Sequence, residues 1–266
     1  MYILPQSLGP FNYRLRDKIK YYPLLFHYLK YPRIIWAREK EGFDKVKFFS
    51  RRNLRQSVDL VLMQKDLDLG NIFKADPKLR SYSIPESSVA IIPNSKVKEN
   101  NKENDLYKIY QGIISFLLQR DRNIYIIRHS YEDLDFCKEL KRLFPDHERV
   151  VLIEDDLNSI ELKELIGKFD YLIASRYHSV IHAYKSRKPC FILGWAVKYK
   201  ELALSFEQSA YCFDIRTNLA EKSINNALNL LDSNYRIESE KIGQKIKILE
   251  EEDNIFHEIA DDYNKL

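Results

Sequence analysis

The stretch "YLIASRYHSVIHAYKSRKPCFILGWAVKYK", residues 171–200, contains two short apolar runs separated by a helix-like pattern. The first run, 171–176, ends in Arg176, and the second, 189–194, begins with Pro189. Apolar runs of this length that alternate with helices are typical of parallel strands buried on both faces of a sheet. The stretch therefore predicts a strand–helix–strand unit of an α/β protein.

The same alternation continues on both sides of this stretch. Three further apolar runs, each followed by a helical pattern, lie upstream at 88–94, 123–129 and 149–155. Downstream we expect a helix near 196–206, a short strand at 211–215 and helix over most of the remaining chain. Asn158 and Glu161 have the spacing of a capping box at a helix start. Together these patterns predict a doubly wound parallel sheet covered by helices on both faces.

The first 85 residues have a less regular pattern. We expect a strand and a turn in "YILPQSLGPF", a strand and a helix in "YPRIIWAREKEGFDKVKFF", and a further strand in "QSVDLVLMQ". These are fewer units than a complete doubly wound domain needs. The polar segment 78–88 contains Pro85 and several serines, so it is the expected linker between two domains, 1–85 and 86–266.

The composition is that of a soluble globular protein. The chain has 266 residues, and its 45% hydrophobic and 31% charged fractions exclude a disordered or fibrous chain. The formal net charge is only +4 and no basic block could track a phosphate backbone, so nucleic acid is not an expected partner. Three widely spaced cysteines without a CxxC pair are typical of reduced thiols in the cytoplasm. With neither a signal-peptide layout nor a long apolar span, we expect a cytoplasmic protein; peripheral contact with the inner face of the membrane stays open.

Polar side chains follow the apolar run that ends at Arg176. Arg176, Tyr177 and His178 stand where a predicted strand ends and a predicted helix begins. At this edge of an open parallel sheet, helix N-termini point N–H groups at bound anions. Arginine can form paired hydrogen bonds to a carboxylate or phosphate, and histidine can exchange a proton near neutral pH. The triplet predicts an anion-binding, proton-transferring edge; alternatively, Arg176 pairs with a neighbouring carboxylate and His178 caps the helix.

A second strand end has the same character. Arg128, His129 and Ser130 follow another predicted strand, so two strands of one sheet both end in Arg and His. This favours one shared cleft. His178 and His182 are four residues apart, but no third ligand has suitable spacing, so no metal site is expected. The chain has no GxGxxG, P-loop or GxSxG motif, which argues against dinucleotide binding, NTP hydrolysis and α/β-hydrolase chemistry.

Several of these motifs resemble those of one family. Residues 171–206 are similar to the C-terminal signature of the polysaccharide pyruvyl transferases: an apolar strand, an Arg-x-His triplet, a helix, a Pro-led strand and a Lys near an aromatic residue. "LPQSLGPF" (4–11) resembles the family's Pro-Gln-Ser-x-Gly-Pro element, and "IIRHSYEDLDF" its His-containing strand end. "WAREKEGFDKV" followed by "SVDLVL" resembles its Arg-Glu helix and Asp-containing strand. The resemblance spans about residues 3–214.

The resemblance implies a glycosyltransferase-B-like α/β fold, with two Rossmann-like domains facing each other across a cleft. It also implies transfer of a pyruvyl group from phosphoenolpyruvate to two hydroxyls of a sugar. The product would be a cyclic ketal on a cell-surface glycan, such as an exopolysaccharide, or on its lipid-linked precursor. Apart from phosphoenolpyruvate as the donor substrate, no cofactor is implied.

In this interpretation His178 is the general acid that protonates the enol carbon. Arg176 holds the donor's carboxylate or phosphate, and His129 belongs to the same catalytic group. The expected substrate-binding residues are Tyr177, Ser179, Asn94, Ser130, Lys198, Gln6 and Ser7. Among these, Asn94 takes the place of an arginine found in some relatives, and Lys198 supplies a further cation. Gln6 and Ser7 are expected on the opposing wall of the cleft.

The N-terminal domain is expected to be incomplete. Family members usually begin with a strand and a Gly-Asn-rich loop well before the Pro-Gln-Ser element, whereas Met1 here stands directly before that strand. Two other functions also fit the sequence. One is a glycosyltransferase that uses a nucleotide sugar, with Glu154 and Asp155 as candidate ribose ligands. The other is a non-catalytic binding or scaffold remnant, which the short N-terminal portion suggests. The pattern defines neither the acceptor sugar nor an oligomeric state.

Overall fold

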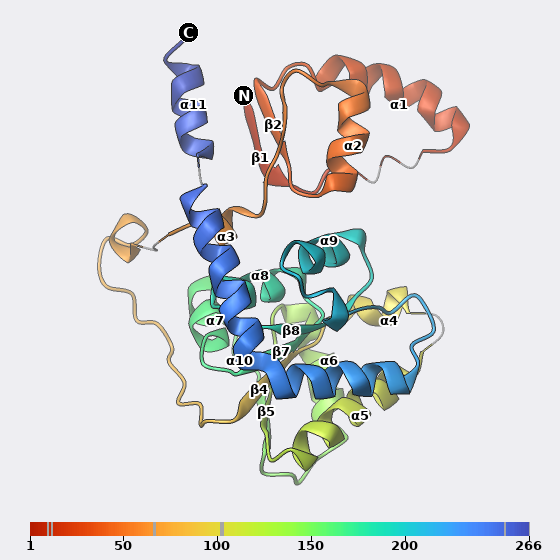
Figure 1. Cartoon of the computed structure of the whole chain (residues 1–266), viewed down its shortest axis with the longest axis vertical. Helices are drawn as coiled ribbons and strands as arrows, with labels where there is room; N and C mark the ends of the chain where they lie inside the picture. The colour runs from red at the N-terminus through yellow and green to blue at the C-terminus, as the bar shows by residue number, and fades with distance from the viewer. Residues whose placement is uncertain (10, 12, 66–67, 102–103, 253, 266) are drawn as a thin grey trace. The chain divides into compact units, whose positions relative to one another are not determined.

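The computed structural model describes the chain except residues 10, 12, 66–67, 102–103, 253 and 266. The chain forms two compact units (Figure 1). Unit 1 consists of Met1–Lys65 and Leu249–Leu266, and unit 2 consists of Asp66–Ile248. Each unit has its own sheet.

Unit 1 contains a parallel sheet with the strand order β1-β2-β3. Its strands are β1 (Tyr2–Gln6), β2 (Ile34–Ala37) and β3 (Leu54–Gln56). Its helices are α1 (Leu15–Tyr28), α2 (Lys40–Phe49), α3 (Leu60–Met63) and α11 (Ile255–Tyr263). The central strand β2 is buried on both faces: Ile34 and Trp36 pack against Ile255, whereas Ile35 and Ala37 pack against Val46. This alternation is the two-residue period of a strand.

Unit 2 contains a six-stranded parallel sheet with the order β6-β5-β4-β7-β8-β9. Its strands are β4 (Ser88–Ile92), β5 (Asn123–Ile127), β6 (Val150–Ile153), β7 (Tyr171–Ala174), β8 (Cys190–Gly194) and β9 (Cys212–Asp214). Its helices are α4 (Lys96–Asn100), α5 (Leu106–Gln119), α6 (Leu134–Arg142), α7 (Ser159–Ile166), α8 (Tyr177–Lys185), α9 (Val197–Ser205) and α10 (Glu221–Glu251), the last of which ends in unit 1. Each expected strand of this region is present, within two residues of its predicted bounds.

The strand order of unit 2 changes direction at β4. The chain runs outward from β4 through β5 to β6, returns to β7 on the other side of β4, and continues to β8 and β9. Right-handed crossovers place the helices of the two halves on opposite faces. Side chains of α5, α6 and α10 accordingly share one apolar cluster, while α8 contacts β7, β8 and α7. In such sheets the ligand site lies beyond the carboxyl ends of the strands beside the change of direction.

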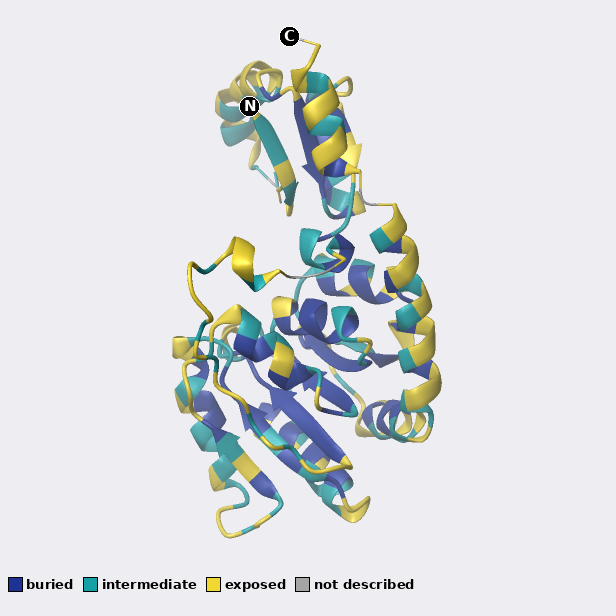
Figure 2. Cartoon of the chain, turned by 90° about the vertical axis from the view of Figure 1, so that its left-hand side faces the viewer, coloured by how far each residue is buried: buried dark blue, intermediate teal, exposed yellow. Residues whose placement is uncertain are grey.

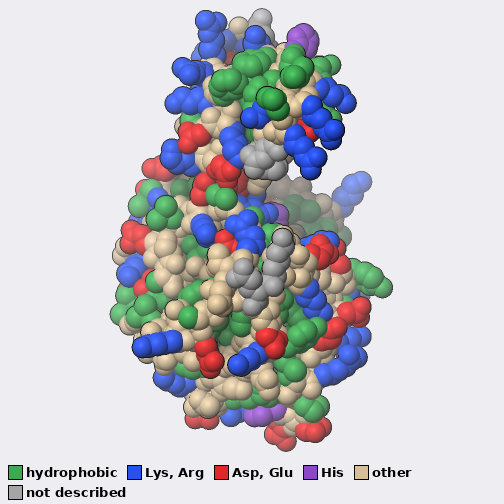
Figure 3. Space-filling view, turned by 90° about the vertical axis from the view of Figure 1, so that its right-hand side faces the viewer, with side chains coloured by type: hydrophobic (Ala, Val, Ile, Leu, Met, Phe, Trp, Pro, Cys, Tyr) green, Lys and Arg blue, Asp and Glu red, His purple; other side chains and the backbone are tan. Residues whose placement is uncertain are grey.

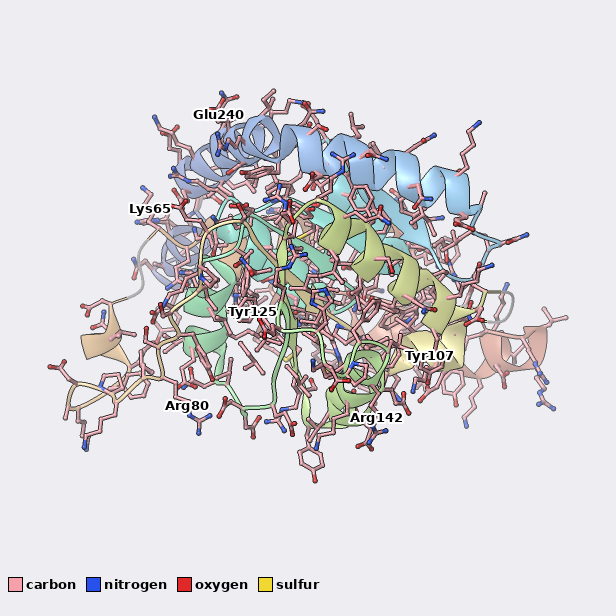
Figure 4. The ribbon with its side chains drawn as sticks, turned by 90° about the horizontal axis from the view of Figure 1, so that it is seen from below. Lys65, Arg80, Tyr107, Tyr125, Arg142 and Glu240 are labelled. Atoms are coloured by element: carbon pink, nitrogen blue, oxygen red, sulfur yellow. The ribbon has the colours of Figure 1, made fainter. Side chains whose placement is uncertain are left out.

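Helices on both faces bury the strands of unit 2. All residues of β4, β7 and β8 are buried, and these strands are dark blue in Figure 2. Seen from below, Arg142 on α6 and Glu240 on α10 lie toward the outside, whereas Tyr125 of β5 lies toward the middle of the view (Figure 4). Burial on both faces explains why the strands read as continuous apolar runs in the sequence.

The division between the units differs from the expected boundary at residue 85. The segment predicted as a linker forms hydrogen bonds with residues in α7 and just after it, in unit 2. The N–H of Arg80 donates to Glu161 at 2.9 Å, and Lys168 Nζ donates to the carbonyl oxygen of Tyr82 at 2.9 Å. Hydrogen bonds with distant partners thus attach this polar segment to unit 2.

The last helix also belongs to a different unit from the one expected. The sequence pattern assigns all C-terminal helices to the second domain, but α11 is part of unit 1. Asp262 on α11 accepts hydrogen bonds from the hydroxyl of Tyr2 at 2.8 Å and from Arg33 Nη2 at 2.9 Å. Together with the packing of Ile255 on β2, these bonds make α11 a cover of the small sheet.

Two elements of unit 1 correct or extend the sequence prediction. The strand expected in "QSVDLVLMQ" is wrong, because β3 ends at Gln56 and Leu60–Met63 form a helical turn. Asp59 caps that turn by accepting the N–H of Val61 at 3.1 Å. Helix α1 is not evident in the sequence because it contains Pro23 and none of its residues is buried.

Candidate functional site

The site residues predicted in unit 2 follow four neighbouring strands. Asn94 comes after β4, His129 after β5, Arg176 after β7 and Lys198 after β8. Because all these strands are parallel, their carboxyl ends lie at one edge of the sheet. The edge includes the ends of β4 and β7, where the strand order changes direction. It is therefore the position at which open α/β sheets bind ligands.

Among the site residues predicted in unit 2, His178 is the exposed one. Helix α8 begins at Tyr177, so His178 lies in its first turn, near the positive end of the helix dipole. Its ring centroid is 5.7 Å from that of Tyr177, and Lys198 Nζ lies 4.8 Å from the Tyr177 ring centroid. Imidazole, phenol ring and ammonium group are thus contiguous across the ends of β7 and β8. This arrangement combines a group that can exchange protons with positive charge suited to an anion.

His129 supports the start of α8. Its Nδ1 is 2.8 Å from Oγ of Ser179, which is fully buried. Burial, aided by the positive charge of Arg176, lowers the pKa of His129 to about 4. The imidazole is therefore neutral at neutral pH and has no acidic proton to give. Its geometry suits positioning of the first turn of α8, which carries His178, better than proton donation.

Arg176 is held in an ion pair. Its Nε and Nη2 donate to the two carboxylate oxygens of Asp133 at 2.8 and 2.7 Å, and Nη2 also donates to Glu132 at 2.5 Å. The Arg176 side chain is 17% exposed and that of Asp133 is 0% exposed. The salt bridge that the sequence left open as an alternative is therefore present. A direct contact between Arg176 and the donor stays a prediction.

Asp133 is the residue of this edge that the sequence analysis missed. Besides binding Arg176, its carboxylate accepts the N–H of Ser95 at 2.9 Å and the N–H of Ser130 at 3.1 Å. These three partners follow β7, β4 and β5, so one buried carboxylate connects three strand ends. A signal was present, because Ser130 and Asp133 have the spacing of a capping box, which the structure contains.

The polar side chains after β4 and β5 make internal contacts. Asn94 is buried; its Oδ1 accepts the N–H of Lys96 at 2.9 Å, and its Nδ2 donates to the carbonyl oxygen of Ser175 at 3.4 Å. The Ser130 hydroxyl takes part in the capping box with Asp133. These groups hold the loops around the site in place. Contact of Asn94 or Ser130 with a substrate stays a prediction.

Unit 1 has a polar network at the carboxyl edge of its own sheet. Ser7 Oγ donates to Glu39 at 2.8 Å and accepts from Arg38 Nη2 at 2.7 Å. Arg38 also donates to Glu39 at 2.8 Å and to Asp59 at 2.7 Å. Arg38, Glu39 and Asp59 lie in motifs that the sequence analysis noted, but only Ser7 and the exposed Gln6 were predicted as site residues. The network connects the ends of β1, β2 and β3.

The described part of the chain contains no group of three or more His, Cys, Asp or Glu side chains that could hold a metal ion. His178 and His182 lie on α8, but the first is exposed and the second is buried, so they do not present a common binding face. The imidazole of His178, the ammonium of Lys198 and the N-terminus of α8 lie at this edge. Together they suit an anion that receives a proton.

Comparison with solved structures identifies the fold. UDP-GlcNAc 2-epimerase from Methanocaldococcus jannaschii aligns with a TM-score of 0.53 and 13% identity, over 84% of this chain and 60% of that one. S. aureus MnaA in its UDP co-structure gives 0.54 and 12%, over 79% and 55% of the chains. The pneumococcal O-GlcNAc transferase GtfA, in complex with UDP and GlcNAc, gives 0.52 and 13%, over 92% and 47%. The fold is thus glycosyltransferase-B-like, and this chain spans about half to 60% of the length of these proteins.

A protein-family model matches most of the sequence. No curated protein matches the chain. The model of the family described as "Polysaccharide pyruvyl transferase" matches residues 1–196, which include the network of unit 1 and the His178 edge of unit 2. On this evidence the chain belongs to the polysaccharide pyruvyl transferase family.

Proposed function

We propose that this protein transfers the pyruvyl group of phosphoenolpyruvate to two hydroxyls of a sugar and forms a cyclic ketal. The acceptor is a cell-envelope glycan or its lipid-linked precursor. Family membership supports a transferase that acts on a polysaccharide. The observation that carries the proposal is the exposed His178 at the start of α8, next to Tyr177 and Lys198.

The reaction needs a proton donor next to a site for negative charge. Protonation of the methylene carbon of phosphoenolpyruvate produces a methyl group and an oxocarbenium-like carbon. One sugar oxygen bonds to that carbon, the carbon–oxygen bond to phosphate breaks, and a second sugar oxygen completes the ketal. Of the two protons that the hydroxyls release, one restores the acid and the other leaves with the phosphate. The donor remains anionic throughout, so fixed positive charge favours its binding.

We assign the roles at this edge from the contacts in unit 2. His178 is the general acid, because it is exposed at the start of a helix. Lys198 and the N-terminus of α8 bind the donor's carboxylate or phosphate. Arg176 adds positive charge, but Asp133 and Glu132 occupy its Nε and Nη2. His129 keeps α8 in position through Ser179.

Two measurements on the whole chain test these roles. Calorimetric titration measures phosphoenolpyruvate binding, and mass spectrometry of saccharides with neighbouring hydroxyls measures ketal formation, with phosphate release followed in parallel. His178→Ala should lower turnover by about 10²–10⁴ and leave donor binding largely unaltered. Lys198→Ala should weaken donor binding, whereas Lys200→Ala, a change at an exposed lysine on the same helix, serves as the matched control. Wild-type turnover of the His178 variant would remove this residue from the chemistry.

The nucleotide-sugar alternative is distinguished in the same titration. Its candidate ribose ligands already have partners: Glu154 pairs with Lys138 at 3.0 Å, and Asp155 accepts a hydrogen bond from the Tyr82 hydroxyl at 2.8 Å. We therefore expect phosphoenolpyruvate to bind and UDP not to bind. Binding of UDP alone would replace the proposal with the glycosyltransferase function. Binding of neither compound would favour the non-catalytic alternative.

A further inference from the structure

Helices α1 and α2 of unit 1 present large apolar side chains to solvent. Leu15 is 78% exposed, Ile19 75% and Phe48 61%. Phe26, 37% exposed, connects them, because its ring centroid is 5.4 Å from that of Phe48 and because Leu15, Ile19 and Phe26 share one flank of α1. We call these four residues the apolar patch. Figure 3 shows it near the top of the view, with Lys and Arg side chains around it.

The helix that carries most of the patch is strongly basic. Between Arg14 and Lys30 the sequence has five basic residues and one acidic residue. This excess of four positive charges equals the formal net charge of +4 of the whole chain, so the rest of the sequence is neutral in sum. The segment Arg14–Lys30, which contains α1 and its two flanks, therefore accounts for the whole formal excess of positive charge.

A hollow of about 450 Å³ lies next to the patch and combines both kinds of group. Its lining includes the rings of Tyr13, Tyr22, Phe48 and Phe49 and the side chains of Lys18 and Lys45. Lys18 Nζ lies 5.9 Å from the ring centroid of Tyr22. Lys45 is paired with Glu41, so Lys18 is the ammonium group with a recorded ring contact here. An ammonium group beside an aromatic ring suits a phosphate that is attached to an apolar chain.

These features favour an anionic membrane, rather than a second copy of this protein, as the partner of this face. Single exposed apolar residues are common on soluble proteins, but here four adjoin one another on and beside a helix that has no buried residue. Pairing of two copies through this face would bring like charges together, which opposes association. An amphipathic helix with Lys and Arg around Leu and Phe is the pattern of helices that lie in a bilayer interface.

We propose that this face of unit 1 docks on the surface of an anionic lipid bilayer. The apolar patch enters the boundary between headgroups and acyl chains, and the basic side chains of α1 contact lipid phosphates. Among the described residues, none of the helices has the length and apolar character of a membrane span. Docking would bring the protein to lipid-linked acceptors. The inference nevertheless stands apart from the proposed reaction, because vesicle binding requires neither substrate.

Co-sedimentation of the whole chain with vesicles tests this surface. We expect binding to vesicles of phosphatidylcholine with phosphatidylglycerol, and much weaker binding to phosphatidylcholine alone. Binding should fall as sodium chloride rises, because the screening length shortens from about 10 Å at 0.1 M to about 3 Å at 1 M salt. Leu15→Ser/Ile19→Ser should reduce binding by about tenfold or more. Arg16→Glu/Lys20→Glu should reduce it by at least about 25-fold, since each basic residue at such a surface contributes roughly fivefold.

Matched changes elsewhere serve as controls. Leu204→Ser removes a 70% exposed side chain from α9, and Lys222→Glu/Lys247→Glu reverses two exposed charges on α10. Neither should change vesicle binding, and all variants should keep the circular dichroism spectrum of the wild type. Unchanged binding of the α1 variants, or an equal loss in the controls, would overturn the proposal. Absence of vesicle binding, together with an oligomer that Leu15→Ser/Ile19→Ser dissociates, would assign the face to self-association instead.

Discussion

Asp133→Asn is expected to lower the free energy of unfolding of unit 2 by about 3–5 kcal/mol, the usual effect of removing one partner of a buried ion pair. The change replaces one oxygen by an NH₂ group and alters the side-chain shape very little. It leaves the guanidinium of Arg176, only 17% exposed, with less compensation for its charge. It also places an amide donor opposite groups that are themselves donors.

The magnitude follows from the contacts of the carboxylate. Asp133 is fully buried and accepts two hydrogen bonds from Arg176 and one each from the N–H groups of Ser95 and Ser130. Asparagine retains one acceptor oxygen, so about two of these bonds are lost, and hydrogen bonds to charged groups contribute about 1.5–3 kcal/mol each. Glu132 still pairs with Arg176 and is 52% exposed, which keeps the loss below the upper end of that sum.

Tryptophan fluorescence can report on unit 2 alone. The chain has two tryptophans, Trp36 in unit 1 and Trp195 in unit 2, so urea unfolding is followed in a Trp36→Phe background. The control is Asp121→Asn, because Asp121 pairs with Arg149 at 3.2 Å but is 95% exposed. Asparagine also tolerates the φ of 55° at that position. The control should change stability by less than about 1 kcal/mol. A similarly small change for Asp133→Asn would refute the conclusion that this carboxylate holds three strand ends together.

Three further predictions use the same unfolding measurement. The pKa of His129 is lowered from 6.5 to about 4, so below pH 6.5 the unfolded chain binds a proton that the folded chain excludes until about pH 4. The free energy of unfolding should therefore fall as pH decreases through this window, by at most about 1.4 kcal/mol per pH unit. His129→Gln should remove this pH-dependent loss, and identical pH profiles for the wild type and the variant would contradict the prediction. Gly194→Ala should destabilise unit 2 by about 1–3 kcal/mol, because a Cβ there would lie 2.6 Å from Cγ of Tyr199. Gly112→Ala, where a Cβ meets nothing within 4 Å, should instead stabilise α5 by about 0.5–1 kcal/mol. A change in the free energy of unfolding of the same sign for both variants would contradict this prediction. Tyr184→Phe should raise stability by about 1–3 kcal/mol, because the buried hydroxyl has no hydrogen-bond partner among the described residues; a loss of stability would show that it has one.

The strands of unit 2 and the helices between them can be predicted from the sequence. These strands are buried on both faces, so each appears as a continuous apolar run, and each helix between them has its own apolar period. The common edge of His129 and His178 followed from the parallel order of the strands. The capping box at Asn158 and Glu161, which the structure contains, needs residues only three positions apart. All of these signals come from neighbours in the chain.

Tertiary structure alone decided which distant residues meet. Asp133 and Arg176 are 43 positions apart, and Tyr2 and Asp262 are 260 positions apart. A local pattern can mark Asp133 as a helix cap, but none shows that it meets Arg176 or that Asp262 meets Tyr2. For the same reason α11 could not be assigned to unit 1, and the ion pair of Arg176 could be stated only as an alternative to ligand binding. The free energy of a buried ion pair depends on the groups that surround it, and those groups come together only when the chain has folded.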